Sequence, residues 1–285
     1  MTIIVADTLE TLHRLRPPSQ KIALVPTMGN LHKGHLYLVE RALEHAEHVI
    51  VSIFVNRLQF APHEDFDRYP RTLMNDCALL ETLKQSGRIT VFAPEEKILF
   101  PVPQNFHIQP PPMANTLEGY FRPGFFGGVC TIVMKLFQIT APHLAFFGQK
   151  DRQQLTLIRQ MIEQFSLPIE LIEAITIRGE NKLALSSRNT YLTEQQLQQA
   201  PELYQTLEEV GEQIRKGDFI PTPHHYQMLE QKAQKDLSEK GWVVDYIAIR
   251  DTHTLNGYPA TSQTPTVILG AAKLGQTRLI DNIDV

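Results

Sequence analysis

Two histidines stand three residues apart in Pro26–His35, PTMGNLHKGH, directly after an apolar run. If a helix starts there, His32 and His35 face the same direction, because residues three apart lie on one face of a helix. A helix N-terminus offers amide N–H groups and a partial positive charge, and two imidazoles beside it would extend these into a phosphate site. The backbone at Met28 and Gly29 could approach such a ligand closely. H-x-G-H alone is a weak signal, but its position after a strand favours function.

A second polar group follows a later apolar run, at Phe147–Gln154, FGQKDRQQ. Lys150 supplies a compact cation that suits a phosphate group. Asp151 beside it could accept hydrogen bonds from ribose hydroxyls. A solvated ion pair at the start of a helix explains the same two residues equally well, so this segment alone does not decide between the two interpretations.

The segment Leu185–Asn189, LSSRN, places two hydroxyls before the planar cation of Arg188. Neutral donors together with a guanidinium suit a phosphate whose charge grows during displacement. Ser and Asn also favour helix caps and turns, and Ser186 fits that structural role about as well as a functional one.

Two glutamines also follow strand candidates, Gln59 in VNRLQF and Gln154 in KDRQQ. Their neutral amides can hydrogen-bond hydroxyls or a carboxylate without adding charge. An isolated Gln is usually a surface residue, so these two matter only in combination with the other segments.

These segments lie among alternating strands and helices. Apolar runs rich in β-branched residues indicate strands, and periodic stretches between them indicate helices. The expected order is strand 21–26, helix 34–46, strand 48–55, helix 73–85, strand 89–93, helix 129–139, strand 144–147, helix 153–164 and strand 169–177. This alternation predicts an α/β fold with a Rossmann-like, doubly wound parallel sheet, whose ligands bind outside the carboxyl ends of the strands.

The character of the sequence changes after about Ile177. Two Gln- and Glu-rich helical stretches come first, followed by three strand candidates. The helices are expected at 194–216 and 226–239, a loop between them at 220–226, and the strands at 243–249, 266–270 and 277–283. We therefore expect a larger Rossmann-like domain over residues 1–177 and a second, smaller α+β domain over residues 178–285.

Composition and charge exclude several classes of protein. The 285 residues are 42% hydrophobic and 20% charged, which is ordinary globular usage. A formal net charge of −4 gives no basic field for a nucleic acid, so we expect no nucleic-acid partner. No signal peptide and no membrane-spanning stretch is recognisable, so we expect a cytoplasmic protein that does not enter a membrane. Cys77 and Cys130 have no metal-ligand spacing and indicate two buried free thiols.

The ordered set of segments resembles the pantothenate synthetase family, a member of the nucleotidyltransferase superfamily that is recognised by its H-x-G-H loop. The matching segments are PTMGNLHKGH, VSIFVN with QF, YPRT, LEG with RPG, FGQKD with QQL, LALSSRN with YL, and a final RLIDN. The match is dense over residues 22–192 and thinner beyond. The six motifs before RLIDN, in this order, are far more specific than any one of them. Taken together they disfavour the purely structural interpretations of the single segments.

The resemblance implies a ligase that condenses (R)-pantoate with β-alanine, with ATP as substrate and Mg²⁺ as cofactor, in pantothenate biosynthesis. Its implied catalytic residues are His35 as proton donor, His32, Lys150 and Arg188. Its implied ATP-binding residues are Met28, Gly29, His32, His35, Gly148, Lys150, Asp151, Ile177, Leu185, Ser186, Ser187 and Arg188. Gln59 and Gln154 would bind pantoate, and Gln59 would also contact β-alanine. The resemblance further implies a homodimer, and we assign no protein ligand to the metal.

The chain departs from the family pattern at seven positions. Arg57 stands where Pro is common, Gln149 replaces an acidic residue, Arg152 replaces an aromatic residue, Phe125 and Gly127 stand where His and Arg are common, and Asn181 and Lys182 replace an Asp-Gly pair. None of these positions carries an implied substrate contact. Phe125 and Gly127 nevertheless put a role for their loop in doubt.

The implied chemistry has two steps and needs no covalent enzyme nucleophile. The pantoate carboxylate would attack the α-phosphorus of ATP and expel pyrophosphate, and the amine of β-alanine would then displace AMP from the acyl adenylate. Catalysis would rest on positioning two anions and stabilising developing charge, with residues 178–285 as a lid against water. Asp76, after YPRT, either organises this region or is a helix-surface acid.

Two other functions stay open on the sequence alone. An adenylyltransferase of the same superfamily would transfer AMP to a phosphorylated acceptor, and the H-x-G-H loop cannot separate it from a ligase. Gln59 and Gln154 favour pantoate, because a phosphate acceptor would favour cations at its site. A non-catalytic nucleotide-binding protein is disfavoured, since binding alone would not need all four of the implied catalytic side chains.

Overall fold

The computed structural model of the chain describes residues 3–17, 19–61, 64, 66–217, 222–261 and 263–285. The chain forms two compact units, and each is built from separate pieces of the sequence. Unit 1 comprises Met1–Pro111, Arg122–Gln149 and Leu157–Ile175, and unit 2 comprises Pro112–Phe121, Lys150–Thr156 and Thr176–Val285. The chain therefore passes between the units five times, after residues 111, 121, 149, 156 and 175. The domain boundary expected after Ile177 stays a prediction.

Unit 1 contains a six-stranded parallel sheet with the order β1-β4-β3-β2-β5-β6. The strands are β1 Ile4–Ala6, β2 Ile22–Thr27, β3 His48–Ile53, β4 Ile89–Phe92, β5 Leu144–Gly148 and β6 Glu170–Ala174. Most side chains of β2 to β5 are buried. Strands buried on both faces appear in a sequence as continuous apolar runs, which explains why these four could be predicted.

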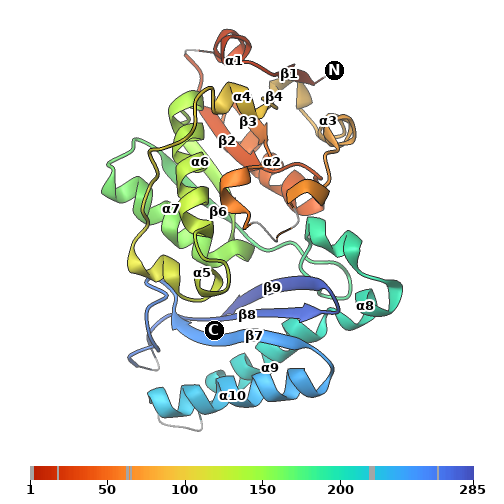
Figure 1. Cartoon of the computed structure of the whole chain (residues 1–285), viewed down its shortest axis with the longest axis vertical. Helices are drawn as coiled ribbons and strands as arrows, with labels where there is room; N and C mark the ends of the chain where they lie inside the picture. Colours follow the sequence, from red (N-terminus) through yellow and green to blue (C-terminus); the bar gives the residue numbers. More distant parts are fainter. Residues whose placement is uncertain (1–2, 18, 62–63, 65, 218–221, 262) are drawn as a thin grey trace. The chain divides into compact units, whose positions relative to one another are not determined.

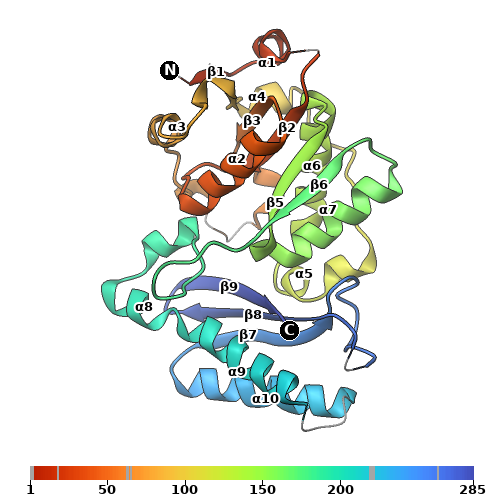
Figure 2. The same ribbon diagram turned by 180° about the vertical axis from the view of Figure 1, so that it is seen from behind.

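The strand order reverses beside β2. From β2 the chain runs to β3 and β4 on one side and then returns to β5 on the other side of β2. Right-handed crossovers therefore place α2, Lys33–His45, and α6, Phe125–Thr140, on opposite faces of the sheet (Figures 1 and 2). Ligands of such sheets bind outside the carboxyl ends of the strands at this reversal. Thr27 ends β2 and Gly148 ends β5, so these two residues mark the expected place.

The other helices up to residue 191 are short except for α7, which has 13 residues. The α-helices are α1 Leu9–Leu15, α3 Leu73–Glu81, α4 Glu96–Leu99, α5 Glu118–Phe121 and α7 Arg152–Gln164. The 3₁₀-helices are η1 Arg57–Gln59, η2 Phe66–Arg68, η3 Ser86–Arg88, η4 Pro112–Asn115, η5 Gln149–Asp151 and η6 Ser187–Tyr191.

Unit 2 contains three α-helices after residue 193 and an antiparallel sheet. The helices are α8 Glu194–Gln199, α9 Glu202–Lys216 and α10 Pro223–Glu239, and the sheet pairs β7 Val243–Asp251, β8 Thr266–Leu274 and β9 Thr277–Asp284 in that order. Helices α9 and α10 lie side by side against one face of this sheet (Figures 1 and 2). Their apolar faces and the sheet enclose a core around Leu207, Tyr226 and Ile268. The α/β fold class with a second, smaller α+β part is thus confirmed.

Two predicted elements of unit 2 need correction. The single helix expected over residues 194–216 is two helices, since Ala200 and Pro201 separate α8 from α9. Proline has no N–H to donate to the preceding turn, so Pro201 interrupts the helical hydrogen bonds although Ala200 itself keeps the α conformation. Residues 223–226, expected in a loop, begin α10, while 220 and 221 lie outside the described residues. Thr222 caps this helix by accepting from the His225 N–H, and Pro223 occupies its first position.

Other predictions differ from the structure at element ends. The helix expected at 129–139 begins four residues earlier, at Phe125, after Gly124 in the left-handed region at φ +83°. The helix expected to reach residue 85 ends at Glu81. The edge strand β1 and the helix α1 were not predicted, because β1 is only three residues long and two of its side chains are exposed.

Both cysteines are free thiols, as predicted. Cys130 lies buried in α6, and burial raises the pKa of its thiol to about 12. Cys77 was predicted to be buried but is only half-buried, on α3. Within the described ranges we find no helix long and apolar enough to cross a membrane.

Candidate active site

The two histidines of the H-x-G-H segment form the N-terminal cap of α2. His32 is the N-cap residue, and its Nδ1 accepts a hydrogen bond from the Gly34 N–H at 3.1 Å. The Nδ1 of His35 accepts from the His32 N–H at 3.3 Å. The two ring centroids lie 4.0 Å apart, so the imidazoles do share one face as predicted.

These hydrogen bonds fix the tautomer of both imidazoles. A ring nitrogen that accepts a hydrogen bond carries no proton, so the proton of a neutral ring lies on the other nitrogen. In both rings Nδ1 is therefore the acceptor of a main-chain N–H. His32 and His35 thus lie at the N-terminus of α2, where the helix dipole favours an anion.

Asp76 of α3 holds the loop between β2 and α2. Its side chain is 1% exposed, and its Oδ1 and Oδ2 accept from the Leu31 and Asn30 N–H groups at 2.7 and 3.1 Å. Oδ2 also accepts from the Thr72 hydroxyl at 3.2 Å. The structure therefore decides between the two interpretations of this residue, because Asp76 organises the loop and is not a helix-surface acid.

The same loop requires glycine at position 29. Gly29 has φ +79°, and a Cβ there would lie 3.0 Å from Ile53 Cγ2 and 3.1 Å from Asp76 Oδ2. Asn30 follows with φ +51°, so two successive residues take the left-handed conformation. Asn is among the few other residues that adopt it readily.

We predict that Asp76→Asn loosens this loop. The asparagine side chain has one acceptor oxygen and one NH₂ group, so one buried loop N–H would face a donor. An unsatisfied buried group costs about 1–3 kcal/mol. Urea unfolding should show a loss of this size, and the KM for ATP should rise if the loop lines the ATP site. Glu40→Gln, on the exposed side of α2, is the matched control and should change neither value. Equal stabilities of the two variants would contradict the prediction.

Gln59 lies beside the loop of β2 within unit 1. Its Nε2 contacts the Met28 sulfur at 3.0 Å, and its Oε1 accepts from the Asn56 side-chain amide at 3.0 Å. Asn56 is 1% exposed and also donates to the Gly128 carbonyl at 3.2 Å. The structure thus brings two predicted residues, Met28 and Gln59, into contact, and it adds Asn56, which the sequence analysis did not single out.

Helix α6 approaches η1 so closely that only glycine fits at position 128. A Cβ on Gly128 would lie 2.1 Å from the Leu58 carbonyl oxygen and 2.7 Å from the Gln59 nitrogen. At Gly127 the nearest atom would be 3.7 Å away, an ordinary contact. The backbone of η1, and with it Gln59, is therefore placed by a close approach at Gly128.

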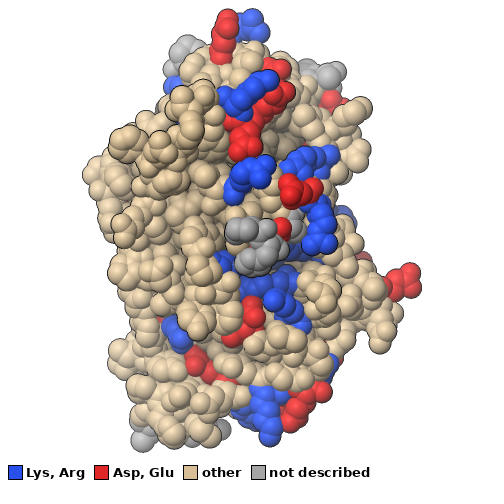
Figure 3. Space-filling view, viewed as in Figure 1, with Lys and Arg blue, Asp and Glu red and all other residues tan. Residues whose placement is uncertain are grey.

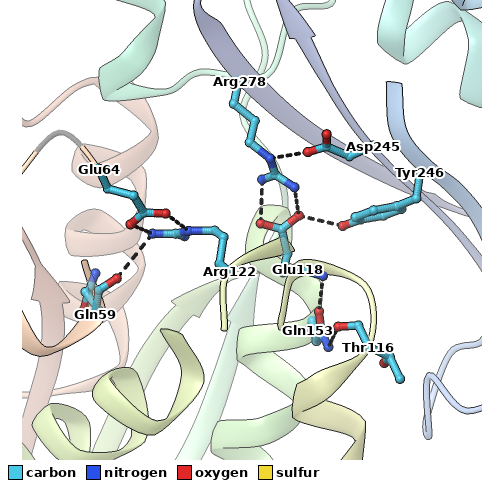
Figure 4. Close-up of polar contacts among 9 residues, drawn as sticks. All are labelled: Gln59, Glu64, Thr116, Glu118, Arg122, Gln153, Asp245, Tyr246 and Arg278. Carbon is cyan, nitrogen blue, oxygen red and sulfur yellow. Dashed lines mark hydrogen bonds and ion pairs between the residues drawn. The ribbon is translucent and has the colours of Figure 1, made fainter. Parts of the chain in front are cut away.

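Arg122 and Glu64 form a two-point ion pair in unit 1. The Nε and Nη2 of Arg122 donate to the two carboxylate oxygens of Glu64 at 2.7 and 2.9 Å, and Nη2 also donates to the Gln59 carbonyl at 3.4 Å (Figure 4). The guanidinium lies 3.7 Å from the ring centre of Phe125. Phe125, one of the departures from the family pattern, therefore packs against an arginine of the RPG segment.

The FGQKD segment ends β5 and starts α7. Gly148 is the last residue of β5, and Lys150 and Asp151 form η5. The Lys150 carbonyl accepts from the Asn282 side chain at 2.9 Å, and Asp151 is exposed. Gln154, in the first turn of α7, is half-buried.

Gln153 beside it is a residue that the sequence analysis missed. It is 2% exposed, and its Oε1 accepts from the Glu118 N–H at 3.0 Å. Its Nε2 donates to the carbonyls of Met113 and Thr116, both at 2.9 Å. Gln153 therefore fixes the segment 112–121 to the start of α7 within unit 2 (Figure 4).

The residues from Ile177 to Ser187 form a tight turn followed by a capped 3₁₀-helix. The Leu185 N–H donates to the Ile177 carbonyl at 2.9 Å, which brings these two predicted ATP-binding residues together. Ser186 caps η6, since its hydroxyl oxygen accepts from the Arg188 N–H at 3.3 Å. Lys182 takes φ +72°, the conformation for which the Asp-Gly of the family pattern supplies a glycine.

A buried charge network links α5 to the sheet of unit 2. Arg278 donates to both oxygens of Glu118 at 2.7 and 2.8 Å and to Asp245 at 2.6 Å (Figure 4). The Tyr246 hydroxyl donates to Glu118 at 2.8 Å. Burial, and then the Glu118 carboxylate, raise the pKa of Tyr246 well above its ordinary value. The arginine of RLIDN is therefore a structural partner of the glutamate of LEG.

Charged side chains of both signs are interspersed on the face of the molecule drawn in Figure 3. Such mixing agrees with the formal net charge of −4. Among the residues that can be placed, no cluster of three or more His, Cys, Asp or Glu could hold a metal ion.

The doubly wound sheet and the imidazole-capped helix after β2 are features of nucleotide-binding α/β enzymes. The Pantoate-beta-alanine ligase family profile matches residues 3–284. The chain therefore belongs to the pantoate–β-alanine ligase family.

Relatives and solved structures agree with this membership. Pantothenate synthetase from Nitrosomonas europaea is 54% identical over 279 residues, covering 98% of this chain and 97% of that protein. The enzyme from Nitrosospira multiformis is 54% identical over 265 residues, covering 93% and 91%. A crystal structure of pantothenate synthetase from Thermus thermophilus has a TM-score of 0.90 at 36% identity, covering 99% of each chain. The crystal structure of pantoate-beta-alanine ligase from Francisella tularensis, complexed with beta-gamma ATP and beta-alanine, has a TM-score of 0.77 at 32% identity. The match covers 99% of this chain and 97% of that one.

These findings confirm the predicted enzyme class, a ligase of pantoate and β-alanine that uses ATP. They favour this function over the two others considered, transfer of AMP to a phosphorylated acceptor and nucleotide binding without catalysis. The predicted site residues divide between unit 1, with Met28, Gly29, His32, His35, Gln59 and Gly148, and unit 2, with Lys150, Asp151, Gln154, Ile177, Leu185, Ser186, Ser187 and Arg188. Their contacts with substrates stay predictions.

Proposed function

We propose that the ligation passes through pantoyl adenylate, with MgATP as the nucleotide substrate. The pantoate carboxylate oxygen attacks the α-phosphorus, the bond to the β-phosphate oxygen breaks, and pyrophosphate leaves. The amine of β-alanine then attacks the acyl carbon, and AMP leaves with the electron pair of the broken bond. The observation that carries this proposal is the pair of imidazoles that cap the start of α2 through their Nδ1 atoms.

The residues of unit 1 would bind phosphate and pantoate. His32 and His35 donate to phosphate oxygens through Nε2, and His35 can pass its proton to the leaving pyrophosphate. The backbone at Met28, Gly29 and Gly148 lines the nucleotide, where glycine allows a close approach. Gln59 hydrogen-bonds pantoate and also β-alanine, and its contact with Asn56 supports this role because it fixes the direction of the amide.

The residues of unit 2 would bind the rest of ATP. Lys150 neutralises charge on the reacting phosphate, and Asp151 accepts from ribose hydroxyls. Ile177 and Leu185 line the nucleotide, and Ser186, Ser187 and Arg188 bind the triphosphate. Gln154 hydrogen-bonds pantoate. The hydrogen bonds described above fix the main chain at Lys150, Leu185 and Arg188, and the roles of the side chains are what the experiments below test.

Four further properties belong to the same proposal. Mg²⁺ enters with ATP, bound to its phosphates, and supplies additional charge neutralisation. The part of the chain from residue 178 onward acts as a lid that keeps water from the adenylate. The enzyme is a homodimer and works in the cytoplasm. Sedimentation of the purified protein would test the dimer.

The decisive experiment measures pyrophosphate release from MgATP without β-alanine. Release should require pantoate in the parent enzyme, and Lys150→Ala should lower its rate at least tenfold, because a cation beside the reacting phosphate is lost. The control is Lys232→Ala, an exposed lysine of α10, which should match the parent. Release that does not depend on pantoate would overturn the adenylate step. Equal rates in both lysine variants would overturn the role of Lys150.

A further inference from the structure

One face of β9 carries polar side chains toward the other pieces of unit 2. Successive side chains of a strand point to opposite faces of the sheet. Leu279 and Ile283 belong to the apolar core of unit 2, whereas Arg278 and Asn282 lie on the opposite face. Arg278 binds Glu118 of α5, and Asn282 binds the segment that starts α7. The two ends of RLIDN therefore contact two chain segments that lie far from it in the sequence.

The Asn282 side chain connects the Lys150 main chain to Arg152. Its Nδ2 donates to the Lys150 carbonyl at 2.9 Å, and its Oδ1 accepts from the Arg152 Nε at 3.4 Å. Arg152 is also paired with the Asp284 carboxylate. Asn282 and Arg152 are each 6% exposed, so little water competes for these groups. With one end of the amide donating and the other accepting, its orientation is fixed.

The main chain at Asn282 is held as well. Its N–H donates to the Asp281 carboxylate at 2.8 Å, and its carbonyl accepts from Arg178 at 3.4 Å. Arg178 in turn binds both oxygens of Asp281 at 2.6 and 2.8 Å. Asp281 is itself buried. The Asn282 amide therefore stands on a rigid support, which is what a side chain needs in order to position another residue.

We propose that Asn282 is a positioning residue for Lys150. Its bond to the Lys150 carbonyl fixes the main chain from which the lysine side chain extends toward the reacting phosphate. A misplacement of about 1 Å at a reacting group can cost about 100-fold in rate. This inference rests on the role proposed for Lys150. It assigns a task in the adenylation step to the final residue of RLIDN.

The test compares Asn282→Asp and Asn282→Ala with the parent in pyrophosphate release from MgATP and pantoate. Asn282→Asp keeps the size of the side chain and its acceptor for Arg152, and it replaces the donor to Lys150 with a negatively charged acceptor that faces the Lys150 carbonyl. We expect the rate constant to fall about 10-fold to 100-fold in both variants. The KM for pantoate should stay within about threefold, because no pantoate contact is removed.

A double-mutant cycle separates positioning from general damage. If Asn282 acts through Lys150, the double variant Lys150→Ala with Asn282→Asp should be no slower than Lys150→Ala alone, within about twofold. Leu279→Val is the matched control on the opposite face of β9. It removes one methylene from the core, so it should lower the unfolding midpoint but leave pyrophosphate release unchanged.

The possible failures are distinguishable. If Lys150→Ala releases pyrophosphate at the parent rate, the role proposed for Lys150 falls, and the positioning role of Asn282 falls with it. If Lys150→Ala is impaired but Asn282→Asp equals the parent, only the inference about Asn282 falls. It falls as well if the two substitutions multiply in the double variant, or if Leu279→Val slows release as much as Asn282→Asp does.

Discussion

Gly128→Ala is expected to displace η1 and with it the predicted pantoate residue Gln59. The added Cβ would lie 2.1 Å from the Leu58 carbonyl oxygen, which is backbone and cannot rotate away. Helix α6 and η1 must therefore separate, and the bond from Asn56 to the Gly128 carbonyl stretches or breaks. Overpacking of this kind costs roughly 3 kcal/mol. A shift of about 1 Å at Gln59 should lower kcat/KM for pantoate about 100-fold.

Gly127→Ala is a control one residue away in the same helix. Its Cβ would meet its nearest neighbour at 3.7 Å, so no atom has to move. Alanine also favours a helix over glycine by up to about 1 kcal/mol, and the variant should be as stable as the parent or slightly more stable. Thermal unfolding and steady-state kinetics with varied pantoate check both variants. A Gly128→Ala enzyme with the parent's kcat/KM for pantoate would disprove the placement of Gln59 by this close approach.

Arg278→Met is expected to cost about 3–5 kcal/mol of unfolding free energy. The substitution keeps an apolar stem of similar length but removes the only cation that Figure 4 shows bound to Glu118 and Asp245. The carboxylates of Glu118 and Asp245, which are both largely buried, then remain without a countercharge. Removing one partner of a buried ion pair costs far more unfolding free energy than removing one partner of a surface pair. Urea unfolding followed by circular dichroism gives the difference.

Two further variants make this prediction specific. Arg215→Met removes a pair with Glu208 whose side chains are 45% and 36% exposed, and it should cost at most about 1 kcal/mol. Adding Glu118→Gln and Asp245→Asn to Arg278→Met removes the uncompensated charges and should recover part of the loss. A loss in Arg278→Met no larger than that in Arg215→Met would show that water reaches the network in unit 2.

The fold could be predicted where burial leaves a periodic or continuous apolar pattern. Strands β2 to β5 are buried on both faces and appear as apolar runs, and their alternation with helices determines a parallel sheet. Strand β1 gives no such pattern, because it is short and half-exposed. The break at Pro201 and the start of α10 at Thr222 and Pro223 follow local rules that the helical periodicity had concealed.

The site could be predicted where one short segment carries the chemistry by itself. The His32 and His35 pair is such a case, since a helix cap is local in sequence. Asp76 and Asn282 could not be assigned, because their partners lie 45 and 132 residues away in the chain. Gly127 and Gly128 look alike in the sequence and differ only in what lies opposite their Cα atoms.

Unit 2 is assembled from three separate pieces of chain, so residues that contact one another in it are synthesised at different times. Lys150 and Asn282 are 132 residues apart, and Glu118 and Arg278 are 160 apart. At about 5–20 residues per second, a ribosome completes the later partner roughly 7–32 s after the earlier one. Through that interval Glu118 lacks Arg278, the cation that neutralises it in the folded unit. The lysine proposed to act on ATP therefore reaches its final position only after the last strand has been made.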